Sequence, residues 1–484
     1  MEDIRNLIDS HREWLLITAT GRSFPLKNDE LELEIFPHKT LFSFLDDKGF
    51  QTWRVKEIQT SNGEIILHLS RNFEREKAKI RLVPRISAQD LGDSVELARL
   101  EKVNRIAEII KKNLPRAKLV RVDLNKDNGR FGQIIFETPN GKQIAVLTGV
   151  SDNLTPEILL STAIMWQTKL SSRLKNPIEN VWILAERKRA KNLQKLHALL
   201  RENWKKRVLI KEFSFSDSEN ENSLKDLPAL EISQLWRRKK RETKRFTETQ
   251  ISETAKKIVQ FAPAEIDVVF ARNGETLRFN GLPFARVRKI FDREQIWLGV
   301  EKEKRVLSEN VFREARKSIE NLKEIRCFES SNKRHEIYRS LPEAWLESVL
   351  RKNINLLDAN LILSPVYHQF RAERDKIDLL GLRKDGRLVI IELKVSPDRE
   401  VIFQVIDYWR KLENERRAGN LQKAKLFGDL EIKNAPAICY LVAPTFSFHP
   451  EFDFLRQTVA PEIEIYRFNL AENWRENFKV LERI

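Results

Sequence analysis

Three charged residues in the last quarter of the chain have the types and spacing that metal-assisted hydrolysis requires. Glu392 and Lys394 lie within the apolar run from Leu388 to Val395. Because the side chains of a strand alternate between its two faces, these two residues point to the same face. A carboxylate buried there without a partner is costly, so this face must meet a metal, water or an opposite charge. Asp378, on the preceding strand, supplies a second carboxylate.

A hairpin turn has to bring Asp378 against Glu392. A two-residue turn at Asp385-Gly386 would pair 384 with 387 and would place Asp378 on the wrong face. A three-residue loop over 384–386, with Gly386 in the left-handed conformation, pairs 383 with 387 and sets Asp378 directly opposite Glu392. A bulge near Asp378 would have the same result. We predict one of these two arrangements.

Two carboxylates and a lysine suit the hydrolysis of phosphodiester bonds. Hard oxygen ligands favour Mg²⁺ or Mn²⁺, which keep several waters and can bind a phosphate oxygen. Such a metal polarises the scissile phosphate and lowers the pKa of an attacking water. Lys394 would position that water or stabilise the negative charge of the transition state. The sequence therefore predicts a site that uses Mg²⁺ or Mn²⁺.

The surrounding residues resemble a known family. Gln404-x-x-x-Tyr408 follows on the next predicted helix, and an earlier helix carries Glu343-x-x-Leu346 ahead of Asn353. With Asp378 and Glu392-x-Lys394, these motifs make residues 338–470 resemble the PD-(D/E)XK, or restriction-endonuclease-like, nuclease superfamily. Within it the stretch is most similar to the NucS/EndoMS mismatch endonucleases and to RecB-type nucleases. It departs from the NucS/EndoMS pattern at Lys376, where that pattern has glycine, and at Ile354, where it has proline.

The resemblance implies an α/β fold with a mixed sheet flanked by helices, and a Mg²⁺-dependent DNA endonuclease. It implies Asp378 and Glu392 as metal ligands, with Glu343 as a supporting acid and further ligand. Lys394 would be catalytic and Gln404 would support it. The predicted partner is nucleic acid, above all double-stranded DNA, and the predicted contacts to it are Arg374, Lys376 and Tyr408.

Several of these residues have simpler alternative roles. Ser340-Leu341-Pro342-Glu343 matches a capping box, which would occupy Glu343 at a helix start and leave Glu347 as its substitute. Gln404 fits the surface of a helix, and Tyr408 fits core packing next to Trp409. Arg374 and Lys376 fit solvated basic residues near a loop equally well.

The chain also repeats itself. Residues 133–151 align without a gap with residues 378–396, and each segment is followed by a helix with a tryptophan and then by an apolar strand. The carboxylates and the lysine are missing from the first copy: Gln133, Leu147 and Gly149 replace Asp378, Glu392 and Lys394, and Ser161 falls near the place of Gln404. We predict a degenerate nuclease-like copy; independent convergence on a common βαβ pattern is the alternative.

These observations divide the chain into four predicted parts. They are a strand-rich module over 1–86, the degenerate α/β domain over 87–215, a linker with a basic helix and a second strand-rich module over 216–330, and the nuclease domain over 331–484. The basic helix is expected over 232–259, either tracking a phosphate backbone or lying solvated between domains. Four basic residues of the second strand-rich module form a candidate duplex-contacting platform, namely Arg278, Arg286, Arg288 and Lys289.

Composition limits the function classes. The 484 residues contain 87 Lys plus Arg and 71 Asp plus Glu, a net charge of +16 that favours a polyanionic partner. There is no apolar run of about 18 residues, no secretory signal and no phosphate-binding glycine loop, and there are only two cysteines. We expect a cytoplasmic protein without a membrane partner, and a homodimer is left open. The rival functions are a non-catalytic nucleic-acid-binding or assembly protein and an RNA-directed nuclease of the same fold.

Overall fold

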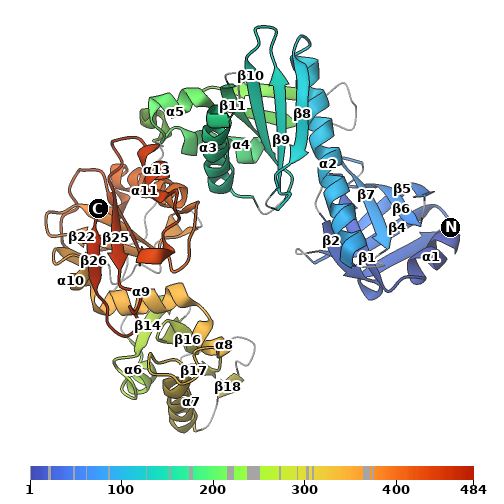
Figure 1. The fold of residues 1–484 in the computed structure, drawn as a ribbon. Helices are drawn as coiled ribbons and strands as arrows, with labels where there is room; N and C mark the ends of the chain where they lie inside the picture. The colour runs from blue at the N-terminus through green and yellow to red at the C-terminus, as the bar shows by residue number, and fades with distance from the viewer. Residues whose placement is uncertain are drawn as a thin grey trace. The chain divides into compact units, whose positions relative to one another are not determined.

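The chain folds into two compact units, each of which combines antiparallel and mixed sheets with helices (Figure 1). The computed structural model describes residues 2–19, 23–46, 49–61, 63–72, 74–84, 88–126, 128–151, 154–173, 178–214, 223–236, 251–271, 274–290, 293–300, 305–307, 310–363, 371–372 and 375–484. One unit holds residues 1–197 and 203–229, and the other holds residues 198–202 and 230–484. The two units are described separately below.

The first unit begins with an antiparallel module. Helix α1 (Glu2–Asp9) is tied to the sheet by Trp14, whose indole N–H donates to the Ile8 carbonyl at 3.0 Å. Alternating apolar residues such as Leu16, Leu67 and Leu82 fill the core. The seven strands lie in the order β2-β1-β7-β6-β5-β4-β3. Their bounds are β1 (Glu13–Thr18), β2 (Ser23–Lys27), β3 (Leu31–Phe36), β4 (Lys39–Asp46), β5 (Gly49–Ser61), β6 (Glu64–Arg71) and β7 (Glu76–Pro84).

The rest of the first unit is a mixed α/β domain. Helix α2 (Ala88–Asn113) presents Val103, Ile106 and Ile110 to a six-stranded sheet in the order β13-β12-β11-β10-β9-β8. The strands are β8 (Lys118–Leu124), β9 (Phe131–Glu137), β10 (Gln143–Gly149), β11 (Ile178–Glu186), β12 (Val208–Ser214) and β13 (Ser223–Leu227). The other helices are α3 (Pro156–Arg173), α4 (Arg187–His197) and α5 (Glu202–Arg207). Because β13 joins this sheet, the domain continues past the predicted boundary at residue 215.

The second unit opens with a five-stranded antiparallel module. Helices α6 (Glu253–Val259) and α7 (Val311–Ile325) contribute Ala255, Ile258 and Ile319 to a core with the sheet residues Leu277 and Val287. The strands follow each other in chain order, namely β14 (Ile266–Ala271), β15 (Gly274–Phe279), β16 (Leu282–Ile290), β17 (Arg293–Leu298) and β18 (Arg305–Leu307).

The predicted continuous helix over 232–259 is wrong. Residues Ile232–Leu235 form a single 3-10 turn, Trp236 has extended backbone, and α6 begins only at Glu253. The side chain of Ser252 caps α6 by accepting a hydrogen bond from the Ala255 N–H, which fixes that start. The basic cluster over 237–245 and most of the predicted linker, 215–222, lie outside the described residues.

The last part of the second unit is another mixed α/β domain. Its sheet has the order β19-β22-β23-β24-β25-β26, while β20 and β21 form a separate two-stranded pair. The strands are β19 (Leu361–Leu363), β20 (Arg371–Ala372), β21 (Asp375–Lys376), β22 (Leu379–Arg383), β23 (Leu388–Leu393), β24 (Ile438–Pro444), β25 (Ile465–Leu470) and β26 (Val480–Arg483). The helices are α8 (Glu336–Arg339), α9 (Pro342–Lys352), α10 (Ile354–Leu357), α11 (Val401–Arg417), α12 (Asn420–Lys423) and α13 (Phe452–Gln457).

The two α/β domains have the same sheet topology. In each, an edge strand and the next two strands are antiparallel, two parallel pairings follow, and a final antiparallel strand closes the other edge. The register also agrees: Gln133 pairs with Leu147, and the β22–β23 register extends to Asp378 opposite Glu392. The predicted alignment of 133–151 with 378–396 therefore matches residue for residue in three dimensions.

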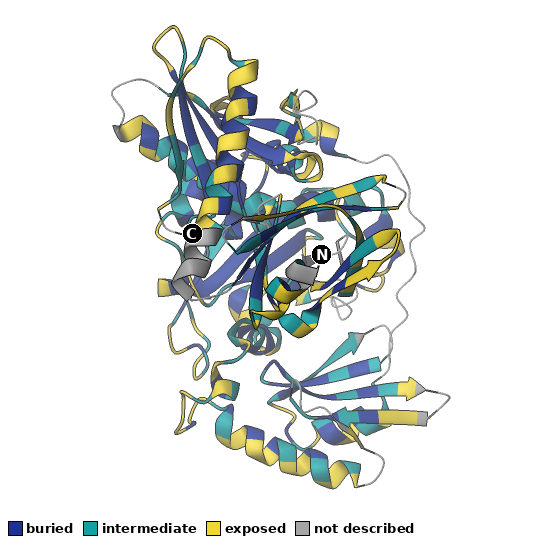
Figure 2. Ribbon diagram, turned by 90° about the vertical axis from the view of Figure 1, so that its right-hand side faces the viewer, coloured by how far each residue is buried: buried dark blue, intermediate teal, exposed yellow. Residues whose placement is uncertain are grey.

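The central strands of both domains are the most deeply buried elements (Figure 2). Every residue of β10, β23 and β24 is buried, as expected for strands covered by helices on both faces. The α/β class predicted from the sequence is confirmed at this level. None of the described helices is long and apolar enough to cross a membrane.

Candidate active site

The hairpin of β22 and β23 sets the register of the candidate site. The N–H of Arg383 donates to the Arg387 carbonyl at 2.8 Å, and the N–H of Gly386 donates back to the Arg383 carbonyl at 2.8 Å. Gly386 has a φ of 84°, which is the left-handed conformation. The predicted three-residue loop is therefore confirmed, and the bulge that was its alternative is not needed.

Asp378 lies where β22 begins, directly beside the end of β23. Its Oδ2 accepts a hydrogen bond from the Leu393 N–H at 3.0 Å. This bond crosses from one strand to the other and holds the carboxylate next to the backbone between Glu392 and Lys394. The two carboxylates therefore meet at the same end of the hairpin, as the spacing predicted.

Glu392 is a buried carboxylate whose negative charge is only partly compensated by nearby positive charge. Its side chain is only 5% exposed, and its Oε2 has no hydrogen-bond partner among the described residues. Burial raises the pKa of Glu392 well above its usual value, and the negative charge of Asp378 raises that pKa further. The ammonium of Lys394 opposes this shift but does not cancel it. A cation bound beside both carboxylates would relieve the repulsion.

Lys394 is held between two acids. Its Nζ lies 3.2 Å from Glu392 Oε1 and 3.3 Å from Asp398 Oδ2. Burial alone would lower the pKa of Lys394, but the charges of Glu392, Asp398 and Glu343 hold that pKa above its usual value. Lys394 is therefore a fixed ammonium, which suits charge stabilisation better than proton transfer.

Glu343 lies in the first turn of α9, and the predicted capping box is wrong. Leu341, not Ser340, precedes the helix, with a φ of 44° and no side-chain cap. The Ser340 hydroxyl donates instead to the Ile337 carbonyl at 3.0 Å. Helix α9 packs against β23, and the charge of Glu343 acts on both Glu392 and Lys394. Glu343 is therefore not part of a capping box at the start of α9. Its role as a metal ligand stays a prediction.

A buried arginine fixes the start of α9. The guanidinium of Arg326 donates to the carbonyls of Ile337, Ser340 and Leu341 and stacks 4.6 Å from the centre of the Trp345 ring. Burial lowers the pKa of Arg326 to about 10, and the positive charge of a neighbouring arginine adds to this shift. Three carbonyls that end α8 and lead into α9 thereby share one cation, which holds the turn that presents Glu343.

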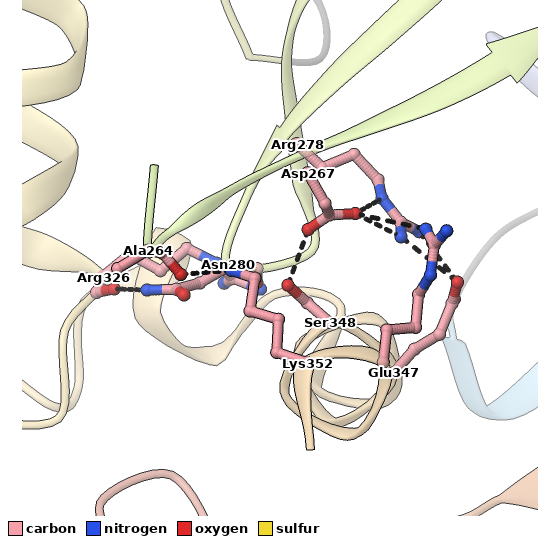
Figure 3. A network of polar contacts seen from close by, with 9 residues as sticks. Ala264, Asp267, Arg278, Asn280, Arg326, Glu347, Ser348 and Lys352 are labelled. Atoms are coloured by element: carbon pink, nitrogen blue, oxygen red, sulfur yellow. Dashed lines mark hydrogen bonds and ion pairs between the residues drawn. The ribbon is translucent and has the colours of Figure 1, made fainter. Parts of the chain in front are cut away.

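Glu347, one turn further along α9, belongs to another network (Figure 3). Its Oε1 lies 3.2 Å from the guanidinium of Arg278 on β15, which also binds Asp267 on β14 through Nε at 2.8 Å. Ser348 donates to the other oxygen of Asp267 at 2.6 Å. Glu347 is therefore occupied by an ion pair with the strand module, and the alternative that it replaces Glu343 is wrong.

Helix α11 supplies the remaining predicted site residues. Gln404 lies in its first turn, and its Oε1 is buried without a hydrogen-bond partner among the described residues. Tyr408 is half-buried, with Lys411 Nζ 5.9 Å from the centre of its ring. Trp409 is a core residue whose indole N–H donates to the Ala437 carbonyl at 2.9 Å. Arg374 and the side chain of Lys376 lie outside the described residues.

Sequence reasoning missed an acidic pair beside the lysine. Asp398 and Glu400 lie in the loop that leads into α11, and Asp398 Oδ1 accepts the Glu400 N–H at 2.8 Å. A small cavity reaches this loop from Glu392 and Lys394 and is also lined by Ser447 and His449, with only about 10 Å³ of room for water. Asp398 follows Lys394 by four residues, but no periodic pattern covers the loop. The ion pair between Asp398 and Lys394 could therefore not be predicted from the sequence.

The acidic pair gives a testable pH dependence of stability. Burial and the hydrogen bond with Asp398 raise the pKa of Glu400 to about 7, so the folded chain keeps this proton when the unfolded chain has lost it. The stabilising contribution is complete below the usual glutamate pKa and is lost as the pH rises through about 7. Glu400→Gln cannot lose the proton. Because Glu400 is half-buried and screened, we expect the variant to gain about 1 kcal/mol over wild type near pH 8.

Urea unfolding of wild type and Glu400→Gln near pH 5 and near pH 8 measures this effect. The difference in the free energy of unfolding between the two proteins should grow toward the higher pH. A difference that is the same at both pH values would contradict the assignment of the raised pKa to Glu400.

Comparisons with known proteins add little to this geometry. No family model and no curated protein matches the chain. It is similar to one solved structure, described as EndoMS in its apo form, with 10% sequence identity and a TM-score of 0.17, over 45% of this chain and 96% of that one. A likeness of this size carries no conclusion about fold or activity.

The donor set of the site fits a small hard cation. Among the described residues, no group of three or more histidine, cysteine, aspartate or glutamate side chains is arranged to hold a metal. Mg²⁺ needs only one or two carboxylates, because waters and substrate phosphate complete its shell. Asp378 and Glu392 provide two, and the unpartnered Oε2 of Glu392 leaves an oxygen available to a cation. The first domain contrasts with this, because the buried apolar Leu147 replaces Glu392.

Proposed function

We propose that the chain is a Mg²⁺- or Mn²⁺-dependent nuclease that hydrolyses DNA phosphodiester bonds in its last α/β domain. The observation that carries the proposal is the meeting of Asp378, Glu392 and Lys394 at one end of a buried hairpin, where one oxygen of Glu392 has no hydrogen-bond partner within the described part of the chain. A buried surplus of negative charge that is only partly compensated is costly in a merely structural site. It is expected where a cation binds as part of function.

Each residue of the candidate active site has a defined role in this proposal. Asp378 and Glu392 would hold the metal, which when bound polarises the scissile phosphate and activates a water. Lys394 provides a fixed positive charge for the negative charge that develops in the transition state. Asp398 orients Lys394 from the other side at 3.3 Å. Glu343 and Gln404 present further oxygens from α9 and α11, and they would position water beside the carboxylates.

DNA is the favoured substrate, and double-stranded DNA the first to be tested. The net charge of +16 supports a polyanionic partner but does not separate DNA from RNA. The further proposals, endonuclease action, a cytoplasmic location and a homodimer, rest on the sequence alone. The first domain, with Gln133 and Leu147 at the corresponding positions, would have an architectural or binding role.

Incubation with supercoiled plasmid, linear DNA and RNA, each with Mg²⁺, Mn²⁺ or EDTA, tests the proposal. We expect nicking or linearisation of the plasmid in either metal and none in EDTA. Cleavage of RNA but not DNA would replace the substrate by RNA and keep the site. Binding to all three nucleic acids without cleavage in any metal would support the rival function of a non-catalytic binding protein.

A further inference from the structure

The first α/β domain repeats the fold of the last one but not its candidate active site. Gln133 of β9 pairs with Leu147 of β10. The same register, extended by one residue, sets Asp378 opposite Glu392 in the last domain. A neutral amide and an aliphatic side chain offer no negative charge to a cation. Leu147 is also completely buried, so the first domain has an apolar residue where a metal ligand is proposed in the last.

The place of the lysine is filled in the first domain. Gly149 stands where Lys394 stands in the last domain, and a Cβ atom built on Gly149 would lie only 2.9 Å from Leu154 Cδ1. Leu154 is itself buried, with 3% of its surface exposed. A longer side chain at this position would therefore have to displace a packed leucine. The first domain has room for a glycine here and not for a lysine.

The supporting acid is replaced as well. Helices α2 and α9 end alike, because the side-chain amides of Asn113 and Asn353 each donate to the carbonyl four residues earlier at 2.8 Å. Ten residues before these asparagines lie Val103 and Glu343. Val103 is fully buried in the core of the first domain. All four matching positions of the first domain are therefore uncharged.

Within the second unit, two short segments pair antiparallel. Residues 198–202 come directly after α4, residues 458–460 come directly after α13, and both segments belong to this unit. Leu200 and Val459 form a β-bridge. A backbone hydrogen bond runs in each direction beside the bridge, from the Arg201 N–H to the Thr458 carbonyl at 2.9 Å and from the Ala460 N–H to the Leu199 carbonyl at 2.8 Å.

This pairing joins residues that correspond in the two repeats. Helix α4 follows β11 and helix α13 follows β24, which are matching strands in the shared topology. Each helix leads into its segment with a buried side chain at every third residue, and Leu200 and Val459 come next after the last of these. The buried residues are Leu193, Leu196 and Leu199 in the first case and Phe452, Leu455 and Thr458 in the second.

The symmetry of the bridge is that of a homodimer interface. Exchanging each residue for its counterpart turns one of the two hydrogen bonds into the other, which is the pattern of an isologous contact about a two-fold axis. In a homodimer the two sides come from two copies. Here both sides come from one polypeptide, so the chain supplies its own partner segment.

We propose that one chain, acting without a second copy, cuts one strand of duplex DNA and leaves a nick. The inference rests on the nuclease function proposed above. Each cut adds one water across one phosphodiester: the water oxygen bonds to phosphorus, the ester P–O bond breaks, and the leaving oxygen takes up a proton. Asp378 and Glu392 serve one strand in a binding event, and the matching positions of the first domain cannot serve the other. The homodimer left open by the sequence would bring two active sites and would cut both strands.

The first product from supercoiled plasmid, in excess over protein and with Mg²⁺, tests the inference. Nicked circles should accumulate before any linear plasmid, and their initial rate should rise in proportion to the concentration of the chain. Asp378→Asn should lower the rate of nicking by at least about 10²-fold. Gln133→Ala makes a matched change at the corresponding position of the first domain and should leave the rate close to that of wild type.

An excess of Asp378→Asn mixed with wild type shows whether chains cut in pairs. If they do, wild type alone yields linear plasmid, and mixed pairs with one inactive site yield nicks instead. We expect nicks as the first product with and without the variant, formed more slowly only as far as the variant competes for DNA.

Three results would contradict the inference, and they are distinguishable. Linear plasmid as the first product, with a rate that rises as the square of chain concentration, would overturn the inference and leave the nuclease function standing. Loss of nicking in a Gln133→Ala chain that unfolds in urea like wild type would show that the first domain takes part in the chemistry, and would also overturn it. No cleavage in Mg²⁺ or Mn²⁺ would overturn the nuclease function itself, and this inference with it.

Discussion

We expect Lys394→Ala to lower the rate of DNA cleavage by about 10²- to 10³-fold, the size expected when a fixed charge that stabilises a transition state is removed. The lysine lies 3.2 Å from Glu392 and 3.3 Å from Asp398, so its removal leaves both acids without this charge. Asp378→Asn should lower the rate at least as much. It keeps the size of the side chain and its hydrogen bond from Leu393, but it removes one of the two charges that would hold the metal.

Two measurements distinguish lost chemistry from lost structure. Lys384→Ala removes an exposed lysine from the turn of the same hairpin and should cut DNA like wild type. Affinity for DNA in EDTA should be unchanged in Lys394→Ala, because the effect lies in the transition state. Metal-dependent cleavage that persists in both Lys394→Ala and Asp378→Asn would show that the active site lies elsewhere in the chain.

The local geometry of this site could be predicted from sequence because it depends on short-range rules. Side chains alternate along a strand, and a glycine with positive φ fixes a three-residue loop, so the spacing of Asp378, Gly386 and Glu392 determines which residues share a face. The same rules explain why the alignment of 133–151 with 378–396 predicted the register of β9 and β10.

Long-range contacts could not be predicted in this way. The pairing of Glu347 with Arg278 joins residues 69 positions apart, and no periodicity links them. The predicted capping box is wrong because Leu341, in the left-handed conformation, precedes α9 in place of Ser340. The carbonyls of Ser340 and Leu341 bind the distant Arg326, and such a tertiary contact can override a local signal. The prediction of a basic helix over 232–259 is wrong because a charge pattern alone does not specify where a helix begins. The Ser252 cap does specify it.

The largest effect on stability is expected at Arg278. Its side chain is 7% exposed and lies between Asp267 and Glu347, which are 12% and 3% exposed. Arg278→Met leaves both acids buried without their cation, and breaking a buried ion pair in this way costs about 3–5 kcal/mol. Arg351 lies 3.8 Å from Asp267 and can offset part of this cost. Urea unfolding followed by tryptophan fluorescence measures the loss, since the buried Trp345 lies on the same helix, α9, as Glu347.

A double variant separates the unpaired charge from lost packing. Arg278→Met with Glu347→Met replaces both partners by apolar side chains and should recover part of the stability lost by Arg278→Met alone. Arg316→Met breaks an exposed pair with Glu320 in the same module and should cost less than about 1 kcal/mol. If Arg278→Met costs no more than Arg316→Met, the network of Figure 3 does not hold the strand module to α9.

Arg278→Met also tests whether the stability of α9 affects the candidate active site. Helix α9 carries Glu343 in its first turn and Glu347 one turn later, so the anchor of the helix and the acid near Lys394 are parts of one rigid element. Arg278→Met should therefore also slow DNA cleavage at temperatures where the chain remains folded, and the double variant should restore both quantities together. Loss of stability with cleavage unchanged would show that Glu343 takes no part in the reaction or that α9 keeps its place without Arg278.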